Sequence, residues 1–177
     1  MNTWDRIWKV HSSALWLVAV RIMVGYIWLS SGLGKLASPD LAGTMAGTLA
    51  KFASQNPHLG YKGILVSTII PHAGLFGQLT AWGETLAGIS LILGAITPLG
   101  ALGALFLNVN IYFAAAWTSP SVNSLSLLMI VLDVVILLGA AGRVLSIDQL
   151  LGHWLPRMAF WSSRESVCPP APRASQA

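Results

Sequence analysis

Four long apolar segments constrain what this chain can fold into. They lie at about 14–34, 74–96, 99–117 and 122–141, each close to the roughly 20 residues that a helix needs to cross a bilayer. Charged residues make up only 9% of the chain and the mean hydropathy is +0.69, whereas soluble domains carry about a quarter charged residues. Strict alternation of polar and apolar residues is absent, which argues against a β-barrel. We therefore predict an all-α integral membrane protein, a four-transmembrane-helix bundle.

The remaining segments divide the chain into a membrane domain and two flanking regions. Residues 1–13 place tryptophans and an isoleucine on one helical face, which is typical of a helix lying in the membrane interface. The membrane domain covers 14–152, and its first span is expected to be retained because it holds Arg21 and is too long for a signal peptide. The outer loop 35–73 is expected to form a short helix over the mouth of the bundle. An interfacial segment and a disordered tail are predicted for 153–177.

Basic residues near the ends of the spans predict the orientation of the bundle. Three lie in the outer loop: Lys35, Lys51 and Lys62. Six lie on the side of the termini: Arg6, Lys9, Arg143, Arg157, Arg164 and Arg173. An even number of spans puts both termini together, so both are predicted to be cytoplasmic in a bacterial-type inner (cytoplasmic) membrane. The pI of about 9.6 then indicates contact with anionic lipids of the bilayer rather than with nucleic acid.

Cysteine and histidine usage argues against several kinds of redox centre. The single cysteine, Cys168, lies in the tail, so no iron–sulfur site, disulfide pair or zinc site is expected and no metal is predicted. Axial ligands of haem usually come from within helices, and none of the four histidines lies well inside a predicted span. A haem would have to use the outer pair His58 and His72, so haem is not an expected cofactor.

Five polar residues stand out inside the predicted spans, where such side chains are rare and often functional. At about 1.5 Å per residue from the inner ends, they lie roughly 10–18 Å deep. Small residues surround Glu84 at helical spacing and form a similar stripe through Asn108, so these faces are expected to meet neighbouring helices rather than lipid. We predict that the five gather in one polar cluster: Arg21, Glu84, Asn108, Asn110 and Asp133.

Two interpretations of this cluster stay open. Arg21 and Asp133 are predicted to form a buried ion pair because their depths match, and that pair would serve either architecture or function. Glu84 is hypothesised to pass protons, since a buried carboxyl group without a cation can be neutral at pH 7. The alternative for Glu84 is a hydrogen-bonded clasp with Asn108 that only holds two helices together.

Three stretches carry a resemblance to a known family. They are "RIMVGYIWLSSGLGKL" in the first span, "GETLAGISLILGAITPLGALGALFLNVNIYFA" across the second and third, and "DVVILLGAAGRVLSIDQLL" at the end. Together they resemble the DoxX/DoxD family, which includes the membrane subunit of thiosulfate:quinone oxidoreductase. The hairpin "ITPLG" lacks the basic residue often found after the threonine. Positions that match polar or charged positions of the family are Arg21, Lys35, Glu84, Asn108, Asn110, Arg143 and Asp148.

The resemblance implies a membrane subunit linked to quinone-dependent oxidation of thiosulfate or a related sulfur compound, with quinone as the expected cofactor. The sulfur anion would approach from the outer side, where Lys35 could attract it. The quinone would enter from the lipid and contact Glu84 as the catalytic residue. Its ring would pack against Trp28 or Trp82, with Asn108 and Asn110 as further polar contacts, although both tryptophans could equally fill the bundle.

Two other functions remain as alternatives. The chain could be a non-catalytic accessory subunit that docks onto a larger membrane respiratory or photosynthetic complex. It could also be a small transporter or proton path that uses Arg21, Glu84 and Asp133, although inverted repeats and broken helices, which are typical of carriers, are absent. The first two functions predict a second redox subunit or a larger complex as partner, besides the lipid bilayer.

Overall fold

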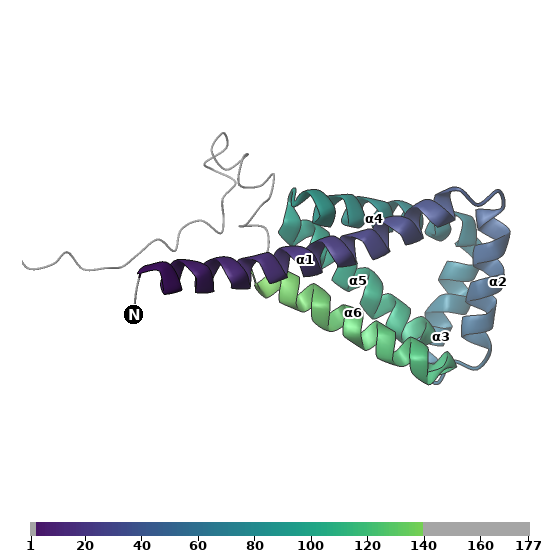
Figure 1. The fold of residues 1–177 in the computed structure, drawn as a ribbon. Helices are drawn as coiled ribbons and strands as arrows, with labels where there is room; N and C mark the ends of the chain where they lie inside the picture. Colours follow the sequence, from purple (N-terminus) through teal and green to yellow (C-terminus); the bar gives the residue numbers. More distant parts are fainter. Residues whose placement is uncertain (1–2, 140–177) are drawn as a thin grey trace, which may run out of the picture.

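The computed structural model describes residues 3–139, and their side chains from Trp16 onward. The long helices of the bundle lie side by side (Figure 1). They are α1 (Thr3–Leu36), α4 (Ala73–Leu93), α5 (Thr97–Ala115) and α6 (Pro120–Leu138). Each contains a stretch long and apolar enough to cross a membrane, which confirms the predicted all-helical class with four spans. The predicted interfacial segment and tail at 153–177 lie outside the described residues, whereas the predicted segment 1–13 continues into the first span within α1.

The outer loop contains the predicted short helix. α2 (Leu41–Ser54) begins after Asp40, whose side chain accepts a hydrogen bond of 2.9 Å from the Gly43 backbone nitrogen, as an N-cap residue does. α2 lies across one end of the bundle (Figure 1). Beyond α2, the Asn56 side chain donates to the backbone oxygens of Phe113 and Ala114, at 3.0 and 3.3 Å. The loop is therefore fastened to the end of α5.

The second span begins close to where the sequence predicts. α4 starts at Ala73, and the predicted start is residue 74. Helical backbone already begins at Leu59 and passes through α3 (Leu59–Ile64), the π-helix η1 (Leu65–Ile69) and the 3₁₀ turn η2 (Ile70–His72) before α4. α3 lies beside α2 at the end of the bundle (Figure 1), and the helical pitch changes around Pro71, which has no N–H to donate.

Two tight turns join the last three spans, as their proline and small polar residues predict. α4 ends at Gly94, which adopts a left-handed conformation with φ of 66°, the usual use of glycine at a helix end. Ile96 is also left-handed, with φ of 52°, and α5 starts directly after it. At the next turn the Ser119 side chain accepts a hydrogen bond of 3.2 Å from Val122 N and caps α6.

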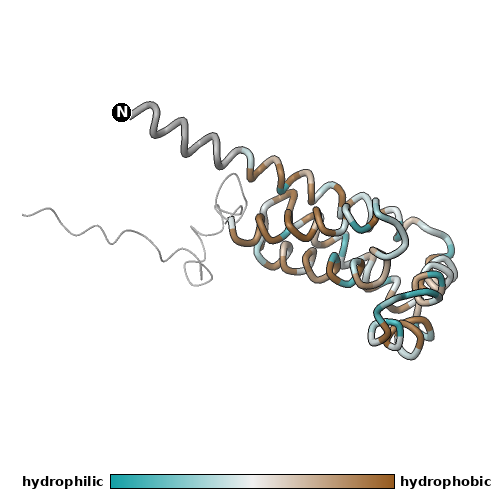
Figure 2. Tube along the Cα trace, turned by 90° about the horizontal axis from the view of Figure 1, so that it is seen from below, coloured by the Kyte–Doolittle hydropathy of each residue, from teal (hydrophilic) through white to brown (hydrophobic). Residues whose placement is uncertain are grey.

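The interior and the exterior of the bundle are both largely apolar. The core cluster comes from α1, α4, α5 and α6, and includes Val24, Trp28, Leu91, Met129 and Ile136. Many large apolar side chains are exposed on the four long helices, whose traces are coloured mostly as hydrophobic in Figure 2. Such a surface is suited to lipid, where apolar groups need no burial against protein. The protein is a multi-pass membrane protein.

Candidate functional site

The closest contact between two spans joins α1 and α4 through glycines. A Cβ atom added at Gly32 would lie 2.6 Å from the backbone nitrogen of Thr85, and one added at Gly88 would lie 2.5 Å from that of Leu29. Only glycine permits such an approach. This register brings the middle of α4 beside the C-terminal end of α1, which stops at Leu36. Beyond that end α2 packs against α4, where Leu41 lies near Gly77.

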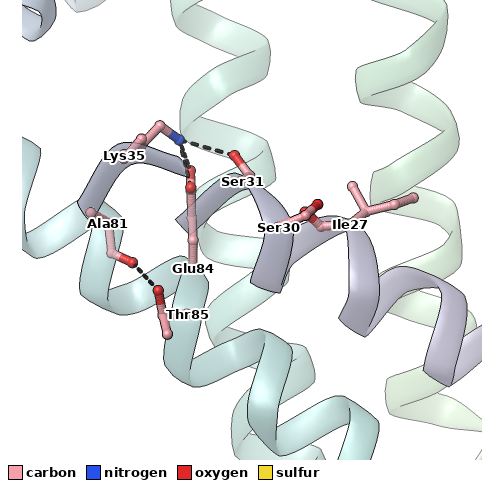
Figure 3. Close-up of polar contacts among 7 residues, drawn as sticks. All are labelled: Ile27, Ser30, Ser31, Lys35, Ala81, Glu84 and Thr85. Carbon is pink, nitrogen blue, oxygen red and sulfur yellow. Dashed lines mark hydrogen bonds and ion pairs between the residues drawn. The ribbon is translucent and has the colours of Figure 1, made fainter. Parts of the chain in front are cut away.

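Glu84 lies at this point and forms an ion pair with Lys35. The Lys35 ammonium contacts both carboxylate oxygens, with Oε2 at 2.5 Å, and also donates to Ser31 Oγ at 3.2 Å. Figure 3 shows the lysine folding back from the end of α1 over the carboxylate. The side chain of Glu84 is 1% exposed and that of Lys35 is 31% exposed. The pair therefore connects a fully buried acid with the surface of the bundle.

A second buried polar group lies between α1, α5 and α6. Asn108 donates a short hydrogen bond from Nδ2 to Oδ2 of Asp133, and both residues are buried. The Trp28 indole lies near enough to interact with the same carboxylate, although its nitrogen makes no hydrogen bond of normal geometry.

A third polar contact joins α3 to α5. The Tyr61 hydroxyl lies 3.1 Å from the Asn110 backbone oxygen and 3.3 Å from Asn110 Oδ1. The Asn110 amide donates to Phe106 O at 2.8 Å. The aromatic ring of Tyr61 also lies against Phe113, and His58 meets the edge of the same ring. This contact fastens α3 to the end of the bundle, ahead of α4.

The predicted polar residues thus lie in separate contacts instead of one cluster. Glu84 is bound to Lys35 and not to Asn108, so the alternative of a Glu84–Asn108 clasp does not hold. Asp133 is bound to Asn108, and Arg21 is buried; the predicted ion pair of Arg21 with Asp133 stays a prediction. Depth sets the level of a residue along its helix but not the direction of its side chain, which explains why Glu84 and Asn108 do not meet.

The five residues predicted to contact quinone also lie at separate places in the bundle. Trp28 is buried beside Asp133, whereas Trp82 is 54% exposed on the outer surface of α4. The sequence analysis missed Tyr61 and the Lys35–Glu84 pair. For the pair, a signal was present, because Lys35 follows Gly32 by three residues and therefore shares its helical face. Their roles toward quinone stay predictions.

The fold and its contacts define a class: a small four-span helical membrane protein with ionisable groups buried between its helices. The family model described as "TQO small subunit DoxD" matches residues 16–163. The match covers most of the chain, and the protein belongs to the DoxD family, that of membrane subunits of the thiosulfate:quinone oxidoreductase (TQO) type. No solved structure matches the chain.

Proposed function

We propose that the protein is the membrane subunit of an enzyme that oxidises thiosulfate or a related sulfur compound and reduces quinone. One observation carries the proposal beyond the family: the acid Glu84 is fully buried, yet its partner Lys35 reaches the surface of the bundle. A charged group in a span is costly and usually functional. An ion pair with one buried and one partly exposed partner is suited to exchanging protons with the surroundings of the bundle.

The chemistry needs protons where the quinone is reduced. Each quinone takes up two electrons and two protons to become a quinol. For thiosulfate, joining two ions through a new sulfur–sulfur bond releases two electrons. Lys35 and Ser31 present hydrogen-bond donors that suit a quinone carbonyl oxygen. The Glu84 carboxylate holds the Lys35 ammonium in place beside Ser31. Lys35 then regains a proton from the surface that it reaches, because the negative charge of Glu84 stabilises its ammonium form.

The proposal also covers the side from which the sulfur anion approaches and the partner that passes electrons to the quinone. The outer loop carries Lys51 and Lys62 besides Lys35, and their charge favours the approach of an anion from that side. The Lys35 charge is matched by Glu84, so Lys35 adds less to this attraction than its position alone predicts. A second redox subunit is the expected partner that passes electrons to the quinone.

Glu84→Gln tests the proposal because it keeps the shape of the side chain but removes the negative charge that stabilises the ammonium form of Lys35. In membranes that carry the variant, thiosulfate-dependent reduction of a short-chain quinone is expected to fall by about 10²-fold or more, the usual contribution of a positioned acid or base. The melting temperature in detergent is expected to stay close to wild type, because Lys35 can turn toward water.

Asp40→Asn is the matched control. It makes the same carboxylate-to-amide change at an exposed N-cap, a position where asparagine caps equally well, and should leave quinone reduction unchanged. A Glu84→Gln protein with full quinone reduction would rule out the proton-exchange role. Membranes that reduce quinone equally well with and without the wild-type chain would rule out the function itself and favour an accessory subunit.

A further inference from the structure

α1 and α6 touch at one end of the bundle and separate toward the other. A Cβ atom added at Gly139, where α6 ends, would lie 3.2 Å from Leu17 Cδ2 of α1. From this point the two helices diverge toward the end where α2 lies (Figure 1). α1 packs mainly against α4, and α6 packs mainly against α5.

Side-chain exposure shows the separation on α1. Val24 and Trp28 are buried on the face of α1 that contributes to the core. Ser31 and Lys35 continue this face by one and two turns beyond Trp28. Ser31 is nevertheless exposed and Lys35 is half-buried. This face of α1 therefore loses its cover between Trp28 and Ser31.

α6 loses its cover at the same level of the bundle. Ile136 is 1% exposed, whereas Leu125, three turns earlier on the same face, is 59% exposed. Leu125 precedes Gly139 by fourteen residues. Ser31 follows Leu17 by the same number, so each lies about 21 Å along its helix from the point where α1 and α6 touch.

We call the region between Ser31 and Lys35 of α1 and Leu125 and Leu128 of α6 the α1–α6 opening. Its α1 side is polar, because Lys35 donates to Ser31 Oγ at 3.2 Å and holds Glu84 with the same ammonium. Its α6 side is apolar, and both leucines are more than half exposed. A ligand with a hydrogen-bond acceptor at its head and an apolar tail matches these two sides.

We propose that quinone enters the bundle through the α1–α6 opening. A ring carbonyl oxygen accepts from Lys35 and Ser31, and the apolar tail lies along Leu125 and Leu128 and continues into the lipid. This inference deepens the proposed function and rests on it. Quinone is the amphiphile that the proposed reaction needs, and its carbonyl oxygens can only accept hydrogen bonds, as the donors of α1 require.

The alternative route would pass Trp82. This side chain is exposed on α4, but it lies two residues before Glu84, which turns it by about 200° around the helix. The two side chains therefore leave α4 on nearly opposite sides. A quinone ring against Trp82 would be separated from the Lys35–Glu84 pair by α4 itself, so the inference assigns Trp82 to contact with lipid.

Photolabelling tests the route. The protein in lipid nanodiscs is illuminated with an azidoquinone that carries a long apolar tail, and labelled peptides are identified by mass spectrometry. Labelling that excess unlabelled quinone suppresses is expected around Ser31 and at Leu125 and Leu128. Suppressible labelling elsewhere, such as around Trp82, would overturn the route but keep quinone binding. No suppressible labelling at any position would overturn the route and the proposed function together.

Leu125→Trp should narrow the α1–α6 opening and weaken the apparent affinity for the azidoquinone by about tenfold or more. Leu86→Trp is the matched control, because Leu86 is 60% exposed one turn after Trp82 on α4, and it should bind as the wild type does. Melting curves in detergent report whether both variants fold, and the wild-type labelling pattern decides on its own if Leu125→Trp does not. Equal affinities in two folded variants would overturn the route.

Discussion

Lys35 and Glu84 depend on each other unequally, because their surroundings differ. Glu84 is enclosed between α1 and α4, whereas the ammonium of Lys35 lies where α1 ends and water or lipid headgroups can reach it. Removing one partner of a buried ion pair leaves an uncompensated charge on the other. The stability of the bundle should therefore respond far more to losing the lysine than to losing the acid.

This asymmetry gives a prediction at the residue scale. Lys35→Met should lower the unfolding free energy in mixed micelles by about 2–4 kcal/mol, somewhat less than for a fully buried pair because Lys35 is partly exposed. Adding Glu84→Gln should restore much of that loss, because no buried charge then remains. Losses that simply add in the double variant would show that the two residues are not coupled.

The candidate site could be predicted from the sequence only in part. Glu84, Asn108 and Asp133 stand out because polar residues are rare in spans, and the structure buries all three. Their partners depend on how each helix is rotated, and a depth estimate does not contain this information. Lys35 was placed in the outer loop because it ends an apolar segment, although its flexible stem lets the charge reach back to Glu84.

At the scale of the elements, the α1–α4 contact is held by backbone proximity rather than by interlocking side chains. Of the glycines at this contact, Gly88 is expected to be the most sensitive to substitution, because a Cβ there would lie 2.5 Å from Leu29 N and 2.7 Å from Leu29 Cα. Neither atom can move without moving α1. A displaced α1 would also pull Lys35 away from Glu84.

Gly88→Ala is therefore predicted to lower the unfolding free energy by about 1–3 kcal/mol, the usual cost of overpacking a core. Gly103→Ala is the matched control in α5, where an added Cβ meets nothing within 4 Å, and should be neutral or stabilising by about 0.5–1 kcal/mol. Melting curves in one detergent compare the two variants. Equal losses in both would mean that the close α1–α4 approach is not formed.

Secondary structure was predictable where one local signal dominates. The apolar lengths, the Asp40 cap and the two turns predict elements that the structure contains. The start of α4 agrees with the sequence, but the π-helical and 3₁₀ turns before it were not predicted, because they are accompanied by packing against α2. Local sequence therefore predicts most elements of this chain but not the irregular helical turns before the second span.

At the scale of the whole molecule, the orientation of the bundle decides which of its ends faces outward. The end of α1, the helix α2 and the Lys35–Glu84 pair lie at the same end of the bundle (Figures 1 and 3). Basic residues are fewer in this outer loop than beside the termini, so this end is predicted to face outward. The Lys35–Glu84 pair would then open toward the outer face.

Cysteine labelling in intact cells tests this orientation. Gln55 is exposed where α2 ends, before α3 begins at Leu59, so Gln55→Cys in a Cys168→Ser background should react with an impermeant thiol reagent added outside. The wild-type chain is the control, because its single cysteine, Cys168, belongs to the terminus predicted to be cytoplasmic and should react only after permeabilisation. The reverse labelling pattern would mean that the bundle has the opposite orientation. Lys35 and Glu84 would then lie on the cytoplasmic side, where a sulfur anion arriving from outside could not reach them.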